Sequence, residues 1–259
     1  MNSRRSSRRT TSLSALLCLV AAVTPVCLAG EANPSPVPLS TDAIVEKLLA
    51  ANARRAQALR GFRGKRSYRV EYHGFPGARE AQMQVEATYV APDKKDFKIV
   101  SQSGSKLLLN RVLLKLLDSE KEALQEPVRS QTELSPRNYE FSLVETQHTP
   151  EGDFYVLALT PRQKSKFLYR GKIWVEARDM AVARIESEPA KNPSFWISHT
   201  QIEHRYAKVG DFWLPAHNQS ITQVRLGGKA VLTIDYTDYE ITKVMPSGSA
   251  PAPAPDSPK

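Results

Sequence analysis

The chain has 259 residues, of which 41% are hydrophobic, and a formal net charge of +9. Its two cysteines, Cys18 and Cys27, both lie within the first 29 residues, so the rest of the sequence excludes disulfides, thiolate metal sites and cysteine nucleophiles. The length suits one large β domain or two small ones.

The first 29 residues are typical of an export signal. Four arginines among the first nine residues make a basic start, and an apolar run follows over 13–23. Small residues then precede a cleavage point after Ala29, with Ala32 as the alternative. We therefore expect a signal peptide over 1–29 and a mature protein in the periplasm, exported by either the general or the twin-arginine route.

The charge of the mature chain is modest. Removal of the four arginines, with no acid among the 29 residues, lowers the formal net charge from +9 to +5. Because an exported protein seldom meets nucleic acid, we expect no nucleic-acid partner. Attraction to anionic lipid, attraction to a partner protein and a plain solubility charge all remain open.

A proline-rich leader over 30–39 precedes the first predicted helix. Ser40 or Thr41 is suited to cap that helix, which should continue to about Leu59 and end at Gly61 and Gly64. A proline- and alanine-rich tail over 245–259 is predicted to be disordered.

Alternating residues then predict three strands before residue 105. The first has Tyr68, Val70 and Tyr72 on one side, the second covers 81–89, and the third contains Phe97. The uninterrupted alternation over 81–89 is typical of an antiparallel strand with one buried face.

A leucine-rich segment over 105–118 follows and predicts a helix, with a second helical piece over 119–125. Its core-facing stripe is made by Leu109, Val112, Leu113 and Leu116, yet further leucines project among the charged residues of the other side. Two interpretations remain open: a movable cover with apolar partners on two sides, or a deeply buried core helix. The 11 residues from 107 to 117 are too few to span a bilayer, which needs about 20.

The second half of the chain predicts seven strands. Their turns are short, so consecutive strands can only be antiparallel neighbours. The expected strands cover 139–144, 154–160, 167–176, 181–187, 195–206, 212–224 and 230–242. We therefore predict an α+β, mostly β fold: a strongly curved antiparallel sheet, an open half-barrel of about ten strands, with helices covering its concave face.

Motifs for catalysis, metals and cofactors are not found in the sequence. The five histidines show no metal-ligand spacing, and the nucleophile and phosphate-loop motifs are missing. We therefore predict no enzyme activity, no cofactor and no metal site.

The side chains expected on the inner face are aromatic and aliphatic. They either fill the half-barrel or line an apolar cavity that holds acyl chains. The predicted lipid-binding residues are Tyr68, Val70, Tyr72, Met83, Val85, Tyr89, Phe97, Leu107, Leu108, Leu113, Leu114, Phe141, Trp174 and Trp196. Because a cover must move for cargo to enter, we expect it to be held by dispersion rather than by salt bridges.

Four strand segments carry a resemblance to a known family. They are the residues KIWVE at 172–176, ARIE at 183–186, GDFWLPA at 210–216 and AVLTIDYTDYE at 230–240. With the order of the predicted elements over 40–244, they make the chain similar to the LolA/LolB-like superfamily, in particular to LolA-like outer-membrane lipoprotein-sorting proteins. The family's carriers have a lid-locking arginine, for which Arg111 is a candidate that its flanking residues do not settle.

The resemblance implies a non-enzymatic periplasmic carrier. Its cargo would be lipid or lipoprotein acyl chains, and its partners membrane-bound donor and acceptor proteins. The alternative is an envelope scaffold or sensor with a filled interior that binds protein partners.

Overall fold

The structure is a computed structural model that describes residues 39–242, except 127, 166, 193–194 and 226. The described residues belong to a unit that begins at Leu39. The predicted signal peptide over 1–29, the leader over 30–38 and the tail over 245–259 lie outside the described residues.

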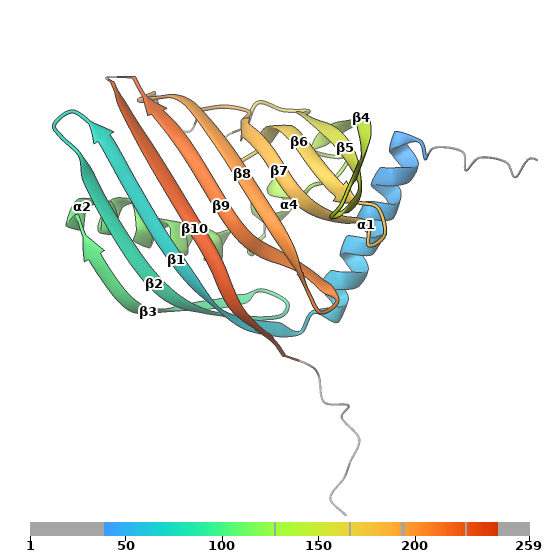
Figure 1. Cartoon of the computed structure of the whole chain (residues 1–259), viewed down its shortest axis with the longest axis horizontal. Coiled ribbons are helices and arrows are strands. Elements are labelled where there is room, and N and C mark those ends of the chain that lie inside the picture. Colours follow the sequence, from blue (N-terminus) through green and yellow to red (C-terminus); the bar gives the residue numbers. More distant parts are fainter. Residues whose placement is uncertain (1–38, 127, 166, 193–194, 226, 243–259) are drawn as a thin grey trace, which may run out of the picture. The chain divides into compact units, whose positions relative to one another are not determined.

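Ten strands form a single antiparallel sheet in the order β3-β2-β1-β10-β9-β8-β7-β6-β5-β4. The strands are β1 Gly61–Gly74, β2 Arg79–Val90, β3 Lys94–Gly104, β4 Tyr139–Thr149, β5 Gly152–Pro161, β6 Tyr169–Glu176, β7 Ala181–Pro189, β8 Ile197–Val209, β9 Phe212–Val224 and β10 Gly228–Ile241. The sheet is strongly curved and open, with β3 and β4 as its edges (Figure 1). The predicted fold class is therefore confirmed.

Two helical segments lie against this sheet. Helix α1, Thr41–Ala58, begins where Ser40 Oγ accepts a hydrogen bond from Ala43 N at 3.3 Å. The second segment is continuous from 106 to 122, and we call it the cover helix. It consists of α2 Lys106–Leu108, the π-helical turn η1 Leu109–Leu113, and α3 Leu114–Glu122. A short helix, α4 Val128–Thr132, was not expected from the sequence.

Both helical segments pack on the same face of the sheet. Strand register joins Tyr68 to Ile234, Asn218, His204, Ile185, Ile173 and Leu157 in a row of directly paired residues. The cover helix packs at the Tyr68 end of this row and α1 at the Leu157 end. The concave face therefore has two apolar clusters, one beneath each helical segment.

The start of the sheet differs from the sequence prediction. Gly61 and Gly64 belong to β1 and do not terminate α1. A Cβ atom on Gly61 would lie 2.6 Å from the carbonyl oxygen of Tyr89, and one on Gly64 would lie 3.1 Å from Cδ1 of Tyr239. The two glycines are thus sites of close approach within the sheet.

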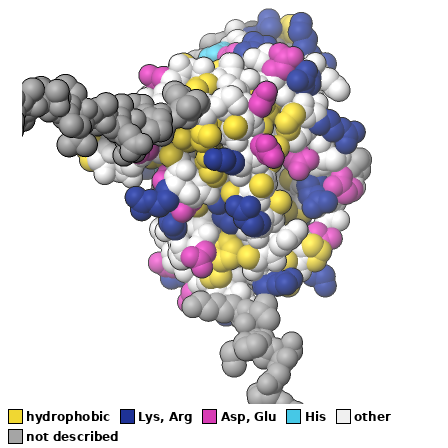
Figure 2. Space-filling view, turned by 90° about the vertical axis from the view of Figure 1, so that its right-hand side faces the viewer, with side chains coloured by type: hydrophobic (Ala, Val, Ile, Leu, Met, Phe, Trp, Pro, Cys, Tyr) yellow, Lys and Arg dark blue, Asp and Glu magenta, His cyan; other side chains and the backbone are white. Residues whose placement is uncertain are grey.

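Hydrophobic and charged side chains are interspersed among the described residues that are visible on the α1 side. From this side, hydrophobic side chains lie in small separate areas between Lys, Arg, Asp and Glu (Figure 2). This agrees with the burial of Ile44, Val45 and Leu48 on the sheet side of α1.

Burial of α1 gives a first prediction. We expect Leu48→Ala to lower the free energy of unfolding by about 2–5 kcal/mol, because Leu48 is fully buried against β5 and β6. Its exposed neighbour provides the control, since Lys47→Ala should change that free energy by less than about 0.5 kcal/mol. Urea unfolding measures both, and equal effects would contradict the assigned face of α1.

Candidate functional site

The first apolar cluster lies between the cover helix and strands β1, β2 and β10. The sheet contributes side chains that are almost completely buried: Tyr68, Val70, Ala81, Met83, Val85 and Ile234. The helix contributes Leu108, Leu109, Leu113 and Leu117, each at most 7% exposed. The leucines of the cover helix thus occupy the concave space over these three strands.

The π-helical turn explains the extra leucines of this segment. The N–H group of Leu114 bonds to the carbonyl oxygen of Leu109, five residues back, so the turn is wider than an α-helical one. Leu109, Leu113 and Leu117, spaced by four, therefore share the buried face with Leu108. A regular α-helix would have placed Leu108 and Leu117 beside the charged face.

A partly buried ion cluster joins the end of the cover helix to the sheet. The guanidinium Nη1 of Arg66 on β1 donates to both carboxylate oxygens of Glu120 on α3, at 2.9 and 2.7 Å. Lys95 Nζ on β3 donates to Glu120 Oε2 at 2.8 Å. The side chain of Arg66 is only 4% exposed, and its charge lies over the rings of Phe97 and Tyr236 at 5.2 and 4.9 Å.

The charges in this cluster stabilise one another. Burial opposes ionisation of Glu120, but attraction to Arg66 and Lys95 outweighs burial and holds the pKa of Glu120 below its usual value. Burial, together with the Glu120 carboxylate, raises the pKa of the Tyr68 phenol to about 12. Glu120 is therefore ionised and paired at neutral pH, and it attaches the cover helix to the wall of the sheet.

A polar strip separates the two apolar clusters. On β8 and β9, Asn218 Nδ2 lies 3.0 Å from His204 Nδ1, and Thr200 Oγ1 lies 3.1 Å from Thr222 Oγ1. These side chains alternate with the outward-facing ones and lie in register with the residues of both clusters. The concave face is therefore not one continuous apolar wall.

The structure brings most of the predicted lipid-binding residues together. Eight lie in or against the first cluster: Tyr68, Val70, Met83, Val85, Phe97, Leu108, Leu113 and Leu114. Phe141 packs in the second cluster, beneath α1. Tyr72 and Tyr89 lie towards opposite ends of the strands, where their hydroxyls donate to the carbonyl oxygens of Phe75 and Pro92.

Three of the predicted lipid-binding residues lie outside the concave core. The inward placement expected for the two tryptophans among them is wrong, whereas Leu107 was expected on the charged side of its helix. Trp174 alternates with the buried Ile173 and Val175, and its indole donates to Gln147 Oε1 at 3.0 Å on the other face. Trp196 precedes β8 and is 55% exposed. Leu107 is 48% exposed because it lies at the beginning of the cover helix.

The ion cluster was not expected from the sequence, and the expectation of a cover held by dispersion rather than by salt bridges is wrong. A signal was present: Arg66 has the same strand phase as Tyr68, Val70 and Tyr72, so alternation placed a charged side chain on the inner face. The candidate lid-locking residue Arg111 is exposed. The arginine that contacts the cover helix is Arg66.

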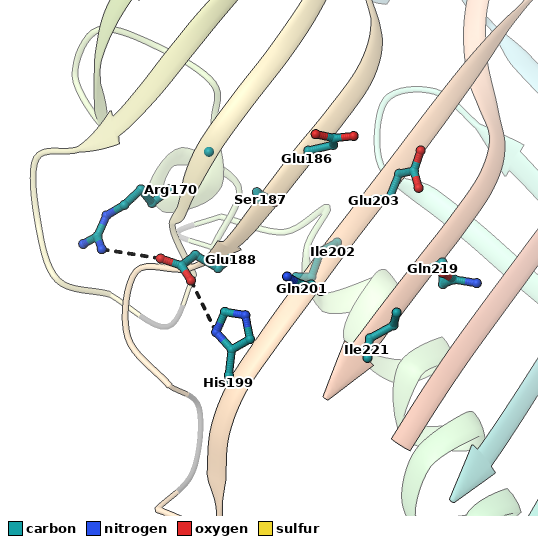
Figure 3. A pocket seen from close by; sticks show the side chains of 11 residues that line it. Arg170, Glu186, Ser187, Glu188, His199, Gln201, Ile202, Glu203, Gln219 and Ile221 are labelled. Atoms are coloured by element: carbon teal, nitrogen blue, oxygen red, sulfur yellow. Dashed lines mark ion pairs between the residues drawn. The ribbon is translucent and has the colours of Figure 1, made fainter. Parts of the chain in front are cut away.

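A separate polar pocket lies where β7 and β8 diverge (Figure 3). Its volume is about 560 Å³, and its polar side chains include Arg170, Glu188 and His199, with Glu188 between the other two at 3.5 and 3.4 Å. These polar groups face away from the helices and do not suit an acyl chain.

The described residues include neither a metal-binding cluster nor a membrane-spanning helix. No group of three or more His, Cys, Asp and Glu side chains in this part of the chain is arranged to hold a metal ion. None of its helices is both long enough and apolar enough to cross a bilayer.

Comparisons with known proteins found similarity at the level of solved structures. No protein-family model and no curated protein matches the chain. A domain assigned as an outer membrane lipoprotein-sorting protein from Vibrio parahaemolyticus is 11% identical with a TM-score of 0.40, covering 78% of this chain and 95% of that one. A LolA superfamily protein from Nitrosomonas europaea is 11% identical with a TM-score of 0.32, covering 80% and 96%.

A chain of the MucA/MucB complex from Pseudomonas aeruginosa is also similar. It is 10% identical with a TM-score of 0.26, and the match covers 76% of this chain and 99% of that one. Solved structures described as lipoprotein-sorting or LolA-superfamily proteins are therefore among those to which this chain is similar.

The ion cluster gives a second prediction. We expect Glu120→Gln to lower the free energy of unfolding at pH 7 by on the order of 3 kcal/mol, because Arg66 stays buried without its carboxylate. The folded-state pKa of Glu120 is depressed, so its contribution is present above the ordinary pKa of 4.5 and is lost as the pH falls. The variant should therefore lose less stability than the wild type between about pH 5 and pH 3.

Urea unfolding at several pH values measures this effect. Glu122→Gln, an exposed change at the end of the same helix, is the matched control and should follow the wild type. If Glu120→Gln and Glu122→Gln have the same pH profile, Glu120 does not attach the cover helix.

Proposed function

We propose that this protein is a non-enzymatic periplasmic carrier that binds the acyl chains of lipids or lipoproteins beneath the cover helix. The proposal depends on one observation: β1, β2 and β10 form an apolar wall that is covered by a single helical segment. When the cover helix moves away, this wall becomes a concave surface large enough to bury an acyl chain.

The cover helix is held to the sheet at both of its ends. At its beginning, Gly104 has φ +92°, and a Cβ atom there would lie 2.4 Å from the carbonyl oxygen of Glu80. The neighbouring Ser105 N–H bonds to the same carbonyl oxygen at 2.7 Å. At its other end, Glu120 forms the ion cluster with Arg66 and Lys95. The cover helix is thus attached at both ends and packs between them through leucines.

The free energies of exposing the leucines and of burying an acyl chain favour reversible binding of the acyl chain. Exposing the four buried leucines of the cover costs roughly 6–12 kcal/mol, at about 1.5–3 kcal/mol each. An acyl chain with about 12 methylene groups gains about 10 kcal/mol when it replaces them on the wall, at about 0.8 kcal/mol per group. Because the two terms are similar, the closed empty state and the open loaded state can interconvert, as release to an acceptor requires.

The second candidate is an envelope scaffold or sensor that binds protein partners. It is favoured by the filled concave space, since the leucines of the cover already occupy the wall. Membrane-bound donor and acceptor proteins belong to the carrier proposal, whereas a scaffold would bind its partners with the cover closed.

A titration with a fluorescent fatty acid tests the carrier. Glu120→Gln should bind the probe about ten-fold more tightly than the wild type, because a weaker attachment raises the population of the open state. Leu114→Glu should also bind it more tightly, since Leu114 packs against the first cluster in the closed state and a charge there weakens that packing. Glu122→Gln is the control and should bind as the wild type does.

Native mass spectrometry of protein isolated from the cell envelope separates the two candidates. The carrier should retain lipid or an acylated peptide under conditions in which a lipid-binding control protein retains its lipid. If its mass is that of the free chain, and the probe binds all three variants equally, the cover does not close a lipid site.

A further inference from the structure

One end of the sheet carries most of the exposed hydrophobic side chains. Among the described residues, ten large hydrophobic side chains are exposed, and six of them lie at the end where β1 and β7 finish and β8 and β10 begin. These six are Phe75, Leu107, Phe167, Tyr169, Phe195 and Trp196. Five of the six are aromatic, and Phe75 and Phe195 are 85% and 74% exposed.

Backbone contacts join these residues into one rim. Gly74 pairs with Gly228, which brings the β1–β2 turn next to the β9–β10 turn, as Figure 1 also shows. Arg225 N donates to the carbonyl oxygen of Trp196 at 2.9 Å, and Ala190 N donates to that of Leu168 at 2.8 Å. We call this surface the aromatic rim. It consists of Tyr169, the first two residues of the cover helix, Lys106 and Leu107, and the described residues of four turns: 75–78, 162–168, 190–196 and 225–227.

The charged residues in the turns of the rim have one sign. The described residues of these four turns include no acid, and their cations are Lys164, Lys191, Arg225 and Arg162, the last of which pairs with Glu140 of β4 at 2.9 Å. The turns at the other end of the same strands, 91–93, 150–151, 177–180 and 210–211, show the opposite pattern. Their charged residues are Asp93, Glu151, Arg178, Asp179 and Asp211. The turns at one end of the strands therefore carry positive charge, and those at the other end carry mostly negative charge.

We infer that the aromatic rim docks the protein on a membrane surface rich in anionic lipid. Lys and Arg side chains near an anionic bilayer are attracted to its headgroups, and exposed aromatic rings are stabilised at the boundary between headgroups and acyl chains. Arg225 combines both features, because its guanidinium lies 4.9 Å from the centre of the Phe195 ring. The Phe195 ring in turn contacts Trp196 edge-to-face at 5.6 Å.

This surface is distinct from the proposed acyl site, and the two are tested independently. The rim consists of exposed side chains at the strand ends, whereas the acyl site is the buried wall of β1, β2 and β10. Leu107 belongs to the rim, so docking would place the beginning of the cover helix at the lipid surface. Glu120→Gln should change probe affinity without changing vesicle binding, and the rim variants should do the reverse.

Co-sedimentation with lipid vesicles tests the rim. The wild-type protein should bind vesicles that contain phosphatidylglycerol, bind vesicles of phosphatidylcholine less, and be released by salt. Arg225→Glu should weaken binding by more than about five-fold, the factor expected for loss of one cation near an anionic surface. The double variant Phe75→Ser/Trp196→Ser should weaken vesicle binding by about ten-fold or more. It removes two exposed aromatic rings that become buried in the bilayer surface when the protein docks.

Matched controls come from the opposite end. Val90→Ser removes an exposed hydrophobic side chain at the far end of β2, and Arg178→Glu reverses a cation in the β6–β7 turn. Both should bind vesicles as the wild type does. The inference is overturned if the wild type does not bind phosphatidylglycerol vesicles at low salt, which is the result expected for a rim that binds a protein partner. It is also overturned if the rim variants and the control variants bind vesicles equally.

Tryptophan fluorescence reports the orientation. The chain has three tryptophans, and Trp213 lies at the other end of the sheet, where its indole donates to Asp179 Oδ2 at 2.8 Å. Brominated lipid should quench the emission of the wild type, and Trp196→Phe should still bind but lose most of this quenching. Unchanged quenching in Trp196→Phe would also contradict the assigned orientation.

Discussion

An open sheet with an apolar concave face needs a cover, and this constraint organises the structure. Closing the sheet into a barrel would bury the face, but β3 and β4 remain as free ends of the strand order. The chain instead covers the face with helices: α1 over β4 to β7, and the cover helix over β1, β2 and β10. Between them the face is polar, so the exposed part of the concavity tolerates water.

The two helical segments are attached differently, which suggests different roles. Arg55 near the end of α1 donates to the carbonyl oxygens of Asp179 and Met180, and Asp179 in turn accepts from Lys208 and Trp213. This links α1 to two hairpin turns. The cover helix has a π-helical turn at its centre and, at one end, an ion cluster built on a single carboxylate, Glu120. We therefore assign movement to the cover helix and a fixed role to α1.

The sequence predicted the elements well because their patterns are local. Alternation over β1 and β2 identified the inner face, and short turns implied antiparallel neighbours, so eight of the predicted site residues meet in the first cluster. The misplaced residues depend on contacts that a local pattern does not contain. In β6, Ile173, Trp174 and Val175 are all apolar, so periodicity cannot distinguish the two faces. Glu120 meets Arg66 across 54 positions, beyond any local pattern.

The central claim is that an acyl chain replaces the leucines of the cover on the wall of β1, β2 and β10. Photo-crosslinking with a diazirine-labelled fatty acid, followed by peptide mapping, tests this claim most directly. The account predicts crosslinks on Met83 and its neighbours on the strand side of the first cluster. Crosslinks confined to the exposed edge of β3 or to the α1 cluster, with none on the wall, would contradict it.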